Sequence, residues 1–283
     1  LPGGIFQLGR FGTSSPTYYP IDGLAAFKVW NRELSVVEVV TLFAEEGVSP
    51  YDLEVLADSP LAYWRCQEQT GTTVNDASGN GRHQGYGASV SLAATTPLFA
   101  GPHLYRITHP GNVSTAANSL SMSDAAWQSP HAGANGKMSL ESWFRVDDLS
   151  GHRTLWFKGG TNQFEYALTI LSTGAVQFSV FTLAGGTAAQ AESAAGEVVI
   201  DTNYHVVATY DKAANAIKVY LNGEEVATAT TSDTSADGTA VLELGRRTSG
   251  SDRMFDGSTS HHAIYGTALS AARVAAHYDA AVP

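Results

Sequence analysis

From residue 137 to residue 245 the chain is a series of short segments in which apolar and polar residues alternate, and this pattern constrains the fold most strongly. In the first segment Met138, Leu140 and Phe144 share one parity, whereas Glu141 has the other. Similar runs follow at 164–171, 175–182, 204–210, 216–221, 225–230 and 241–245. Because successive side chains of a strand point to opposite faces, each run predicts a β-strand with one buried face.

Dipeptides that favour tight turns separate these segments. They are Gly159-Gly160, Thr173-Gly174, Asp211-Lys212, Asn222-Gly223 and Asp237-Gly238. Asn222-Gly223 is the most specific of them, because both residues accept a positive φ and therefore suit a two-residue hairpin. Short strands at this spacing, with very little helix, predict an antiparallel β-sandwich or barrel.

Two short helices are predicted near the two ends of the chain. One starts at Ser35, where Ser35 and Glu38 form a capping box that satisfies free amide groups of the first turn. The other starts at Ser270 and places Val274 and Tyr278 on one face. Both helices are expected to close a β-domain.

The residues around these helices reveal an internal repeat. At a nearly constant offset, Leu8-Gly9-Arg10 matches Leu244-Gly245-Arg246, Asp22-Gly23 matches Asp256-Gly257, Val29-Trp30 matches Ile264-Tyr265, and Leu34-Ser35 matches Leu269-Ser270. We therefore interpret 1–48 as the C-terminal part of a truncated domain, 49–59 as a linker and 60–283 as one complete domain. The truncated copy needs partner strands to bury its apolar residues, and we expect chain before Leu1 or another subunit to supply them.

Composition restricts the partners of the chain. The net charge of -11 disfavours binding to nucleic acid and docking on anionic lipid. No apolar run approaches the roughly 20 residues that span a bilayer, so no membrane insertion is expected. The single cysteine, Cys66, lies in an apolar stretch and cannot form a disulfide within the chain, so we predict a buried, inert thiol.

Several segments resemble laminin-G-like domains, which are jelly-roll sandwiches of the concanavalin-A-like type. They are Leu61 to Arg65, Asp76 to Gly81, Met138 to Arg145, His205 to Asp211, Lys218 to Gly223 and Phe255 to Ser270. The resemblance covers about 60–280, together with 5–47 for the truncated copy. It implies an all-β antiparallel jelly roll with one complete copy preceded by the C-terminal part of another.

A narrower resemblance concerns the two ends of the complete domain. Segments 55–65 and 268–280 resemble minor tail proteins of actinobacterial phages. This implies a non-enzymatic structural or adhesion module of the virion tail, multimeric in the assembly, that contacts host-surface glycan or other virion subunits. A secreted, extracellular bacterial carbohydrate-binding domain is the alternative, and a concanavalin-A-like glycosidase is a further one.

The carboxylates of the chain do not favour the glycosidase. Such enzymes need two carboxyl groups roughly 5–10 Å apart, and the sequence contains no Glu-x-Asp-x-x-Glu run on a strand. Asp147-Asp148 and Glu224-Glu225 lie at strand ends and turns, where we predict solvated side chains, and Glu141 and Glu165 stand alone. No catalytic residue is therefore assigned.

Strand parity also bears on three ring side chains. His261 and His262 are adjacent in a predicted strand, so they should point to opposite faces and cannot easily share one metal. Trp143 has the opposite parity to Leu140 and Phe144, which leaves two alternatives. Trp143 either fills the other side of the sheet beneath a loop or is exposed.

Calcium is the candidate cofactor, because relatives of this type hold the ion with loop oxygens. Asp76 and Asn80 are the candidate ligands, on a loop with glycines at 79 and 81. The alternative is an Asx turn at the start of a strand. Ser260 and His261 stand where many members of the family carry Asp-Glu, and this departure puts the calcium site in doubt.

The glycine-rich loops 76–87, 159–163 and 248–253 are the candidate recognition surface. Sandwich lectins commonly bind sugars at loop ends or over one sheet face, where an aromatic ring stacks on the sugar and amides bind its hydroxyl groups. The candidate carbohydrate-binding residues on these loops are Asn80, His83, Tyr86, Asn162, Gln163 and Arg253.

Overall fold

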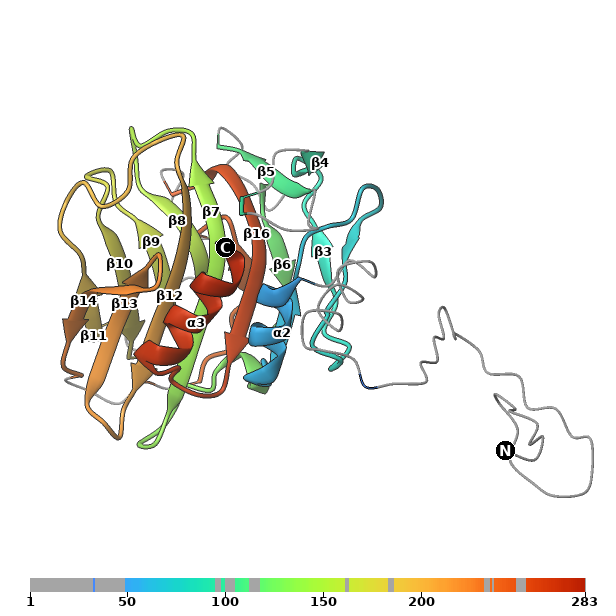
Figure 1. The fold of residues 1–283 in the computed structure, drawn as a ribbon. Coiled ribbons are helices and arrows are strands. Elements are labelled where there is room, and N and C mark those ends of the chain that lie inside the picture. The colour runs from blue at the N-terminus through green and yellow to red at the C-terminus, as the bar shows by residue number, and fades with distance from the viewer. Residues whose placement is uncertain are drawn as a thin grey trace, which may run out of the picture. The chain divides into compact units, whose positions relative to one another are not determined.

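Two antiparallel sheets pack face to face in the computed structural model, and two helices cover the outer face of one sheet (Figure 1). The structure describes residues 33, 49–94, 98–99, 105–111, 118–160, 163–182, 186–231, 235, 237–247 and 253–282. The chain divides into two units, Leu1–Thr41 and Leu42–Pro283, and every described residue except Glu33 lies in the second. The helix predicted from Ser35, and the strands of the truncated copy, lie outside the described residues.

The first sheet has eight strands within the described part of the chain. They are β1 (Ala62–Trp64), β4 (Ser91–Ala94), β5 (Arg106–Pro110), β7 (Lys137–Val146), β12 (Asn203–Asp211), β13 (Ala216–Leu221), β14 (Glu224–Ala229) and β16 (Asp256–Tyr265). Their order is β14-β13-β12-β7-β16-β5-β4, and β1 also pairs with β16. The central strands β12, β7 and β16 are therefore far apart in sequence but adjacent in space.

The second sheet also has eight strands among the described residues. They are β2 (Thr73–Val74), β3 (Gln84–Tyr86), β6 (Leu120–Met122), β8 (Arg153–Gly160), β9 (Gln163–Ile170), β10 (Val176–Phe181), β11 (Thr187–Glu192) and β15 (Leu242–Leu244). Their order is β11-β10-β9-β8-β15-β6-β3-β2. The helices are α2 (Pro50–Ala57), η2 (Ala126–Gln128) and α3 (Ala271–Ala281), and none described is long and apolar enough to cross a membrane.

The predicted all-β sandwich is confirmed, and so are the strands from the alternating runs, which became β7, β9, β10 and β12 to β15. Asn222 and Gly223 both have positive φ in the β13–β14 turn. The prediction of a turn at Gly159-Gly160 is wrong, because both glycines belong to β8 and pair with β9. A Cβ at Gly159 would lie 2.6 Å from the Phe157 ring, so this glycine serves close packing rather than a turn.

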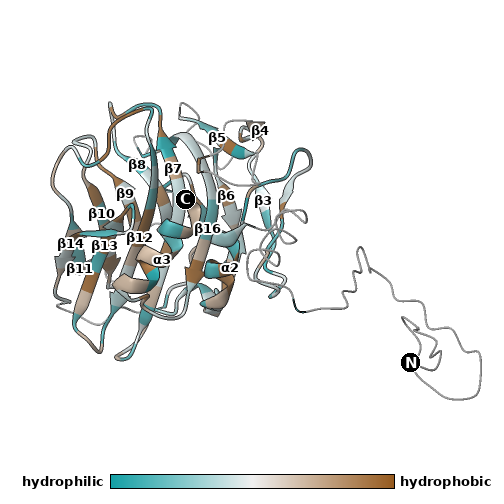
Figure 2. Cartoon of the chain, viewed as in Figure 1, coloured by the Kyte–Doolittle hydropathy of each residue, from teal (hydrophilic) through white to brown (hydrophobic). Residues whose placement is uncertain are grey.

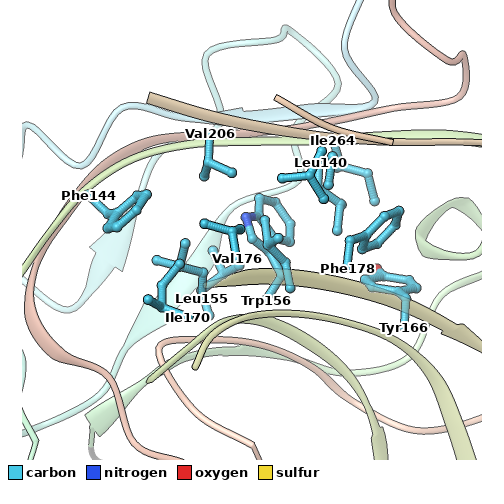
Figure 3. Close-up of a cluster of buried hydrophobic side chains, with 14 of the residues drawn as sticks. Leu140, Phe144, Leu155, Trp156, Tyr166, Ile170, Val176, Phe178, Val206 and Ile264 are labelled. Atoms are coloured by element: carbon cyan, nitrogen blue, oxygen red, sulfur yellow. The ribbon is translucent and has the colours of Figure 1, made fainter. Parts of the chain in front are cut away.

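The inner core consists of the apolar side chains between the two sheets. Figure 3 shows Leu140, Val206 and Ile264 of the first sheet pointing toward Trp156 and Phe178 of the second. All five are fully buried. Figure 2 shows the alternation of hydrophobic and hydrophilic residues along the strands that puts one set of side chains inside. Burial of this apolar surface is the main stabilising contribution to the sandwich.

The outer layer is the set of side chains between the first sheet and helices α2 and α3. Figure 1 shows the two helices side by side on this face, and Arg273 of α3 forms ion pairs with Glu54 (2.7 Å) and Asp58 (2.9 Å). The expectation that β7 has one buried face is therefore wrong. Both faces are buried because the helices cover the second one, and Glu141 is fully buried there.

Helix α2 occupies most of the segment 49–59, for which the sequence predicted a linker. Ser49 is its N-cap, and the Ser49 hydroxyl accepts a hydrogen bond from the Asp52 amide at 3.1 Å while the Asp52 carboxylate accepts one from the Ser49 amide at 2.7 Å. This reciprocal pair is a capping box with an aspartate in place of the usual glutamate. Tyr51 and Val55 are fully buried, so α2 is a packed part of the sandwich.

Helix α3 begins where the sequence predicted. The Ser270 hydroxyl accepts a hydrogen bond from the Arg273 amide at 3.3 Å, and Val274 is fully buried. Trp143, for which two positions were open, lies in the outer layer, with its ring centroid 6.1 Å from those of Tyr51 and Tyr278. It therefore fills the space beneath the helices and is not exposed.

Candidate functional site

A polar groove opens beside β1 and β2. It is lined by Arg65, Gln67, Glu68, Asn75, Asp76 and Ala77. A second hollow, which shares Arg65 and Ala77 with the groove, extends toward α2 and is lined also by Asp52, Leu56 and Tyr63. Charged and amide side chains therefore gather on one continuous open surface at this rim of the sandwich.

Asp76 is the fixed centre of the loop behind the groove. Its Oδ1 atom accepts hydrogen bonds from the amides of Tyr63 and Ser78, both at 2.9 Å. Its Oδ2 atom accepts from the Ser78 hydroxyl and the Arg82 amide, also at 2.9 Å. Burial alone would raise the pKa of Asp76, but these donors outweigh it and lower the pKa, so the carboxylate is ionised and held in place.

Glu68 and Gln67 fix the opposite wall. Glu68 Oε1 accepts hydrogen bonds from the amide (2.8 Å) and side-chain Nδ2 (3.0 Å) of Asn75, and Oε2 accepts one from the Tyr86 hydroxyl at 2.5 Å. The Gln67 amide group exchanges two hydrogen bonds with the backbone of Tyr105. The groove is therefore held by contacts within the chain, which is the condition for a preorganised binding surface.

Three of the six predicted sugar contacts follow Asp76 in the chain, Asn80 and His83 on its loop and Tyr86 at the end of β3. Asn80 donates from Nδ2 to the carbonyls of Pro60 (3.2 Å) and Leu61 (3.0 Å), so it ties the loop to the two residues that precede β1. His83 is exposed, and its Nδ1 accepts a hydrogen bond from the Asp76 amide at 3.1 Å. Tyr86 holds Glu68 in the wall of the groove.

The other three predicted contacts are not part of this groove. Gln163 begins β9 and its Oε1 accepts a hydrogen bond from the Thr239 hydroxyl at 3.1 Å. Arg253 precedes β16, and Asn162 lies outside the described residues. Within the described chain no hydrogen bond or ion pair joins Gln163 or Arg253 to the loop of Asp76. Those three residues stay predictions that belong to other loops.

The donor set at Asp76 and Asn80 does not suit calcium. All four acceptor positions of the Asp76 carboxylate are used by N–H and O–H donors of the chain, and Asn80 presents its NH₂ group to two carbonyls. The bond from the Ser78 amide to Asp76 Oδ1 is the Asx turn that the sequence left as the alternative. Calcium binding here stays a prediction, and it requires that the ion displace these donors.

A second polar cluster, which the sequence did not reveal, lies in the outer layer around Glu141. Glu141 Oε1 accepts hydrogen bonds from the Tyr51 hydroxyl at 2.8 Å and from His205 Nε2 at 2.7 Å. Oε2 accepts from the Tyr265 hydroxyl at 2.5 Å, and His277 Nδ1 lies 3.1 Å from both oxygens. Five residues from β7, β12, β16, α2 and α3 thus meet at one carboxylate.

His277 joins this carboxylate to a second one. Its Nε2 lies 2.9 Å from Asp58 Oδ2, so the ring donates from both nitrogens only as an imidazolium. Burial lowers the pKa of His277, but the carboxylates of Glu141 and Asp58 outweigh it and raise the pKa. Burial likewise raises the pKa of Glu141, yet His277 and His205 hold it well below its ordinary value. The cluster is closed to solvent and anchors the helices to the sheet.

No local signal marks Glu141 in the sequence, because a polar residue at the outward parity of a strand predicts an exposed side chain. The two histidines of the pair 261–262 do lie on opposite faces, as predicted. His261 packs its ring against Phe99 in the outer layer, whereas His262 bonds to Ser142 in the inner core. Cys66 is buried as predicted, and burial raises the pKa of its thiol well above the ordinary value.

Several solved structures are similar to this chain in fold. The binding domain of Paraclostridial Mosquitocidal Protein 1 matches with a TM-score of 0.60 and 14% identity over 79% of this chain and 52% of that one. The ligand-binding domain of botulinum neurotoxin serotype D, in complex with N-acetylneuraminic acid, matches at 0.58 and 13% over 80% and 52%. The serotype G binding domain matches at 0.59 and 10% over 77% and 50%. The chain thus spans about half of each matched structure.

The comparison with curated proteins gives no match. A family model does match residues 119–275, which is more than half of the 283 residues and contains β6 to β16 together with the start of α3. The matched strands form most of both sheets and the whole centre of the first one. The chain belongs to the concanavalin A-like lectin/glucanases superfamily, the laminin-G type of jelly roll that its sequence resembles.

Proposed function

We propose that this chain is a non-enzymatic glycan-binding module whose binding site is the polar groove beside β1 and β2. The observation that carries the proposal is the groove itself, in which charged and amide side chains line an open surface while internal hydrogen bonds hold Glu68 and Asp76 in place. Sugars are bound by such fixed polar groups, which match hydroxyl groups at a low cost of ordering.

The similar structures support a binding role. They are binding domains, and one of them is a complex with N-acetylneuraminic acid. These proteins share only the fold with this chain, so the sugar and the position of its site are not transferred. The groove is argued from this chain's own residues.

A glycanase is the competing function, because the groove contains two carboxylates, Glu68 and Asp76. A general acid needs a pKa that is raised toward neutrality and a proton to give. The pKa of Asp76 is lowered instead, and its four acceptor positions are occupied. This argues against an acid–base pair in the groove, and we expect no release of reducing ends from any polysaccharide that binds.

We further propose that the module acts in adhesion by a phage tail, in many copies and at the host surface. The support is the resemblance of 55–65 and 268–280 to minor tail proteins. In the fold these two segments contact each other, since Arg273 pairs with Asp58 at 2.9 Å. Linked copies raise the apparent affinity of weak sites by about 100-fold or more, which suits a virion.

The test is a glycan array probed with the tetramerised chain, followed by calorimetry on the glycans that bind. Asn75→Ala removes an exposed amide of the groove, and we expect its affinity to fall about tenfold, as for one lost hydrogen bond. Gln163→Ala is the matched control, because Gln163 is an exposed amide outside the groove. If Gln163→Ala lost binding and Asn75→Ala did not, the binding site would lie at the β8–β9 end of the sandwich instead of in the groove.

The tail role has a separate test. The multimerised chain should adsorb to actinobacterial host cells, whereas the monomer should adsorb poorly, and Tyr86→Ala and Asn162→Ala should be measured beside it. Glycan binding without adsorption would contradict the tail role and favour a secreted carbohydrate-binding domain. If the chain neither bound glycan nor adsorbed to cells, contact with other virion subunits would remain as its function.

A further inference from the structure

A lysine and three carboxylates, none of which lines the groove, meet at one end of the sandwich. Lys158 of β8 and Glu165 of β9 are fully buried, and Lys158 Nζ lies 3.0 Å from Glu165 Oε1. The same nitrogen lies 2.5 Å from Oδ1 of Asp124, whose side chain is 31% exposed, and 2.8 Å from the carbonyl of Ala240. Asp237 completes a group of three carboxylates, with Asp124 and Glu165, in which one oxygen of each lies within 4.8 Å of one oxygen of the other two.

The topology of the second sheet explains this meeting. Leu242 of β15 pairs with Lys158 on one side and with Met122 of β6 on the other. The chain that leaves β6 therefore brings Asp124 to the same end of the sheet as Lys158, two strands away. The long lysine side chain reaches across the end of β15 to meet it.

The surroundings enclose Glu165, whose side chain is inaccessible to solvent. Its Oε2 accepts a hydrogen bond from the Ser129 hydroxyl at 2.5 Å. The chain closes over Oε1 at Gly238, where a Cβ would lie 2.9 Å from that oxygen. His131, also fully buried, places Nε2 3.9 Å from Oε2, and neither of its ring nitrogens has a hydrogen-bond partner among the described residues.

From this geometry we infer that Lys158 and Asp124 form an amide cross-link within the chain, with Glu165 as the residue that carries the protons. The nucleophile and the carboxyl group are already in contact, and groups held in this way react as if at very high concentration, about 10⁵ M or more. Burial raises the pKa of Glu165, despite Ser129 and Lys158, which suits a carboxyl group that must both take up and return a proton.

The step balances without any further reactant. Glu165 takes a proton from the Lys158 ammonium, and the neutral amine attacks Asp124 Cγ, where the Nζ–Cγ bond forms. The nitrogen loses a second proton, and the Cγ–Oδ bond to the leaving oxygen breaks. The two protons and that oxygen depart as one water molecule, and Glu165 ends in its starting state. Asp124 lies at the surface, so the water can leave.

The cross-link would fasten β8 to the chain that follows β6 and enclose β15 between them. A covalent closure of this kind restricts the unfolded chain and resists separation of strands under tension. This consequence does not depend on whether the groove binds glycan. The cross-link and the proposed function therefore stand or fall on separate measurements.

The test is mass spectrometry of the purified full chain after trypsin digestion. Without the link, trypsin yields peptides 107–137, which contains Asp124, and 154–158, which ends at Lys158. With the link, trypsin no longer cleaves after Lys158, and peptide 107–137 is joined to peptide 154–212. The mass of the joined product is the sum of the two peptide masses minus one water. Fragmentation should place the bond between Asp124 and Lys158.

Variants separate the roles of the three residues. Asp124→Ala and Glu165→Gln should both restore the full mass and the cleavage after Lys158. Asp237→Asn, a matched change in the same acidic group, should keep the link. An unlinked wild-type chain that is folded by circular dichroism would overturn the inference and leave an ion pair. A bond from Lys158 to Glu165, which would lie within 154–212 alone, would also overturn it.

Discussion

The two layers that flank the first sheet bury polar groups in opposite ways. In the inner core, His262 contacts the hydroxyl groups of Ser142 (2.7 Å) and Thr259 (3.0 Å), and burial, with a smaller effect of His109, lowers its pKa to about 3. In the outer layer, His277 lies between two carboxylates, which raise its pKa despite burial. The sheet that separates these histidines therefore keeps one neutral and the other charged.

The difference shows that partners, rather than depth, decide the charge of a buried group. Both histidine side chains are almost entirely inaccessible to solvent, so desolvation lowers the pKa of each. Hydroxyl groups satisfy a neutral ring, whereas the Glu141 carboxylate stabilises a charged one. The helices make this arrangement possible, because α2 supplies Tyr51 and α3 supplies His277 to the same carboxylate.

The largest expected effect comes from two neighbouring residues of β7 that face the two layers. Glu141→Ala leaves a buried imidazolium and two tyrosine hydroxyl groups without their acceptor, and we expect a loss of about 3–5 kcal/mol in the free energy of unfolding. Leu140→Ala makes a cavity in the inner core and should cost about 2–5 kcal/mol. Urea unfolding measures both.

Hydrogen exchange distinguishes the two variants. Glu141→Ala should raise exchange in α2 and α3 while the strands of the second sheet stay protected, because the charged contacts hold the helices. Leu140→Ala should weaken both sheets together. Equal exchange in the helices of the two variants would contradict the view that Glu141 anchors the outer layer.

The second effect is on the pH dependence of stability. The pKa of His262 is about 3 in the folded chain and about 6.5 in the unfolded chain. Its contribution to the free energy of unfolding is therefore present above pH 6.5 and is lost as pH falls toward the folded pKa. When the pH falls from about 6.5 to 4.5, protonation of His262 in the unfolded chain should lower the free energy of unfolding by about 2–3 kcal/mol. His109, with its pKa lowered to about 4 by burial, adds to the same slope.

His277 has the opposite sign. Because its pKa is raised, His277 contributes to the free energy of unfolding below about pH 6.5, and this contribution is lost as pH rises through the pKa of the folded state. The free energy of unfolding, measured from pH 4.5 to pH 8.5, should therefore pass through a maximum and decrease toward both acid and alkaline pH. His262→Gln should flatten the acid side, and His277→Gln the alkaline side. A variant that flattens the wrong side would contradict the assignment of charge to the two layers.

These layers also mark what the sequence could and could not predict. The inner core followed from strand parity, because Leu140 and Phe144 alternate with outward residues. The outer layer depends on contacts between α2, β7 and α3, which are far apart in the chain, so nothing in the sequence indicated that Glu141 is buried there. At the groove, the loop of Asp76 was recognised from its glycines, but Arg65, Glu68 and Asn75 were missed, because no motif links them.

The third effect compares two buried tyrosines, one in each layer. The Tyr51 hydroxyl donates to the ionised Glu141 at 2.8 Å, and the Tyr166 hydroxyl donates to the neutral carbonyl of Gln128 at 3.0 Å. Hydrogen bonds to charged acceptors are the stronger ones. We expect Tyr51→Phe to cost about 1.5–2 kcal/mol and Tyr166→Phe about 1 kcal/mol in thermal or urea unfolding. The reverse order would show that Glu141 carries no charge.

The smallest effect is expected outside both layers, at an exposed carboxylate. Glu225 pairs with Lys218 across β13 and β14 at 2.7 Å, and about a third of each side chain is exposed. Water screens such a pair and ordering two long side chains opposes it, so Glu225→Gln should change the free energy of unfolding by about 0.5 kcal/mol or less. Glu141→Gln is its counterpart, because the same loss of charge occurs where no water can replace it. If urea unfolding gave similar losses for the two variants, then burial would not distinguish them, and the charge assigned to the outer layer would be wrong. Because Glu225 lies on β14 and does not line the groove, its replacement should also leave glycan binding unchanged, as measured on the same array.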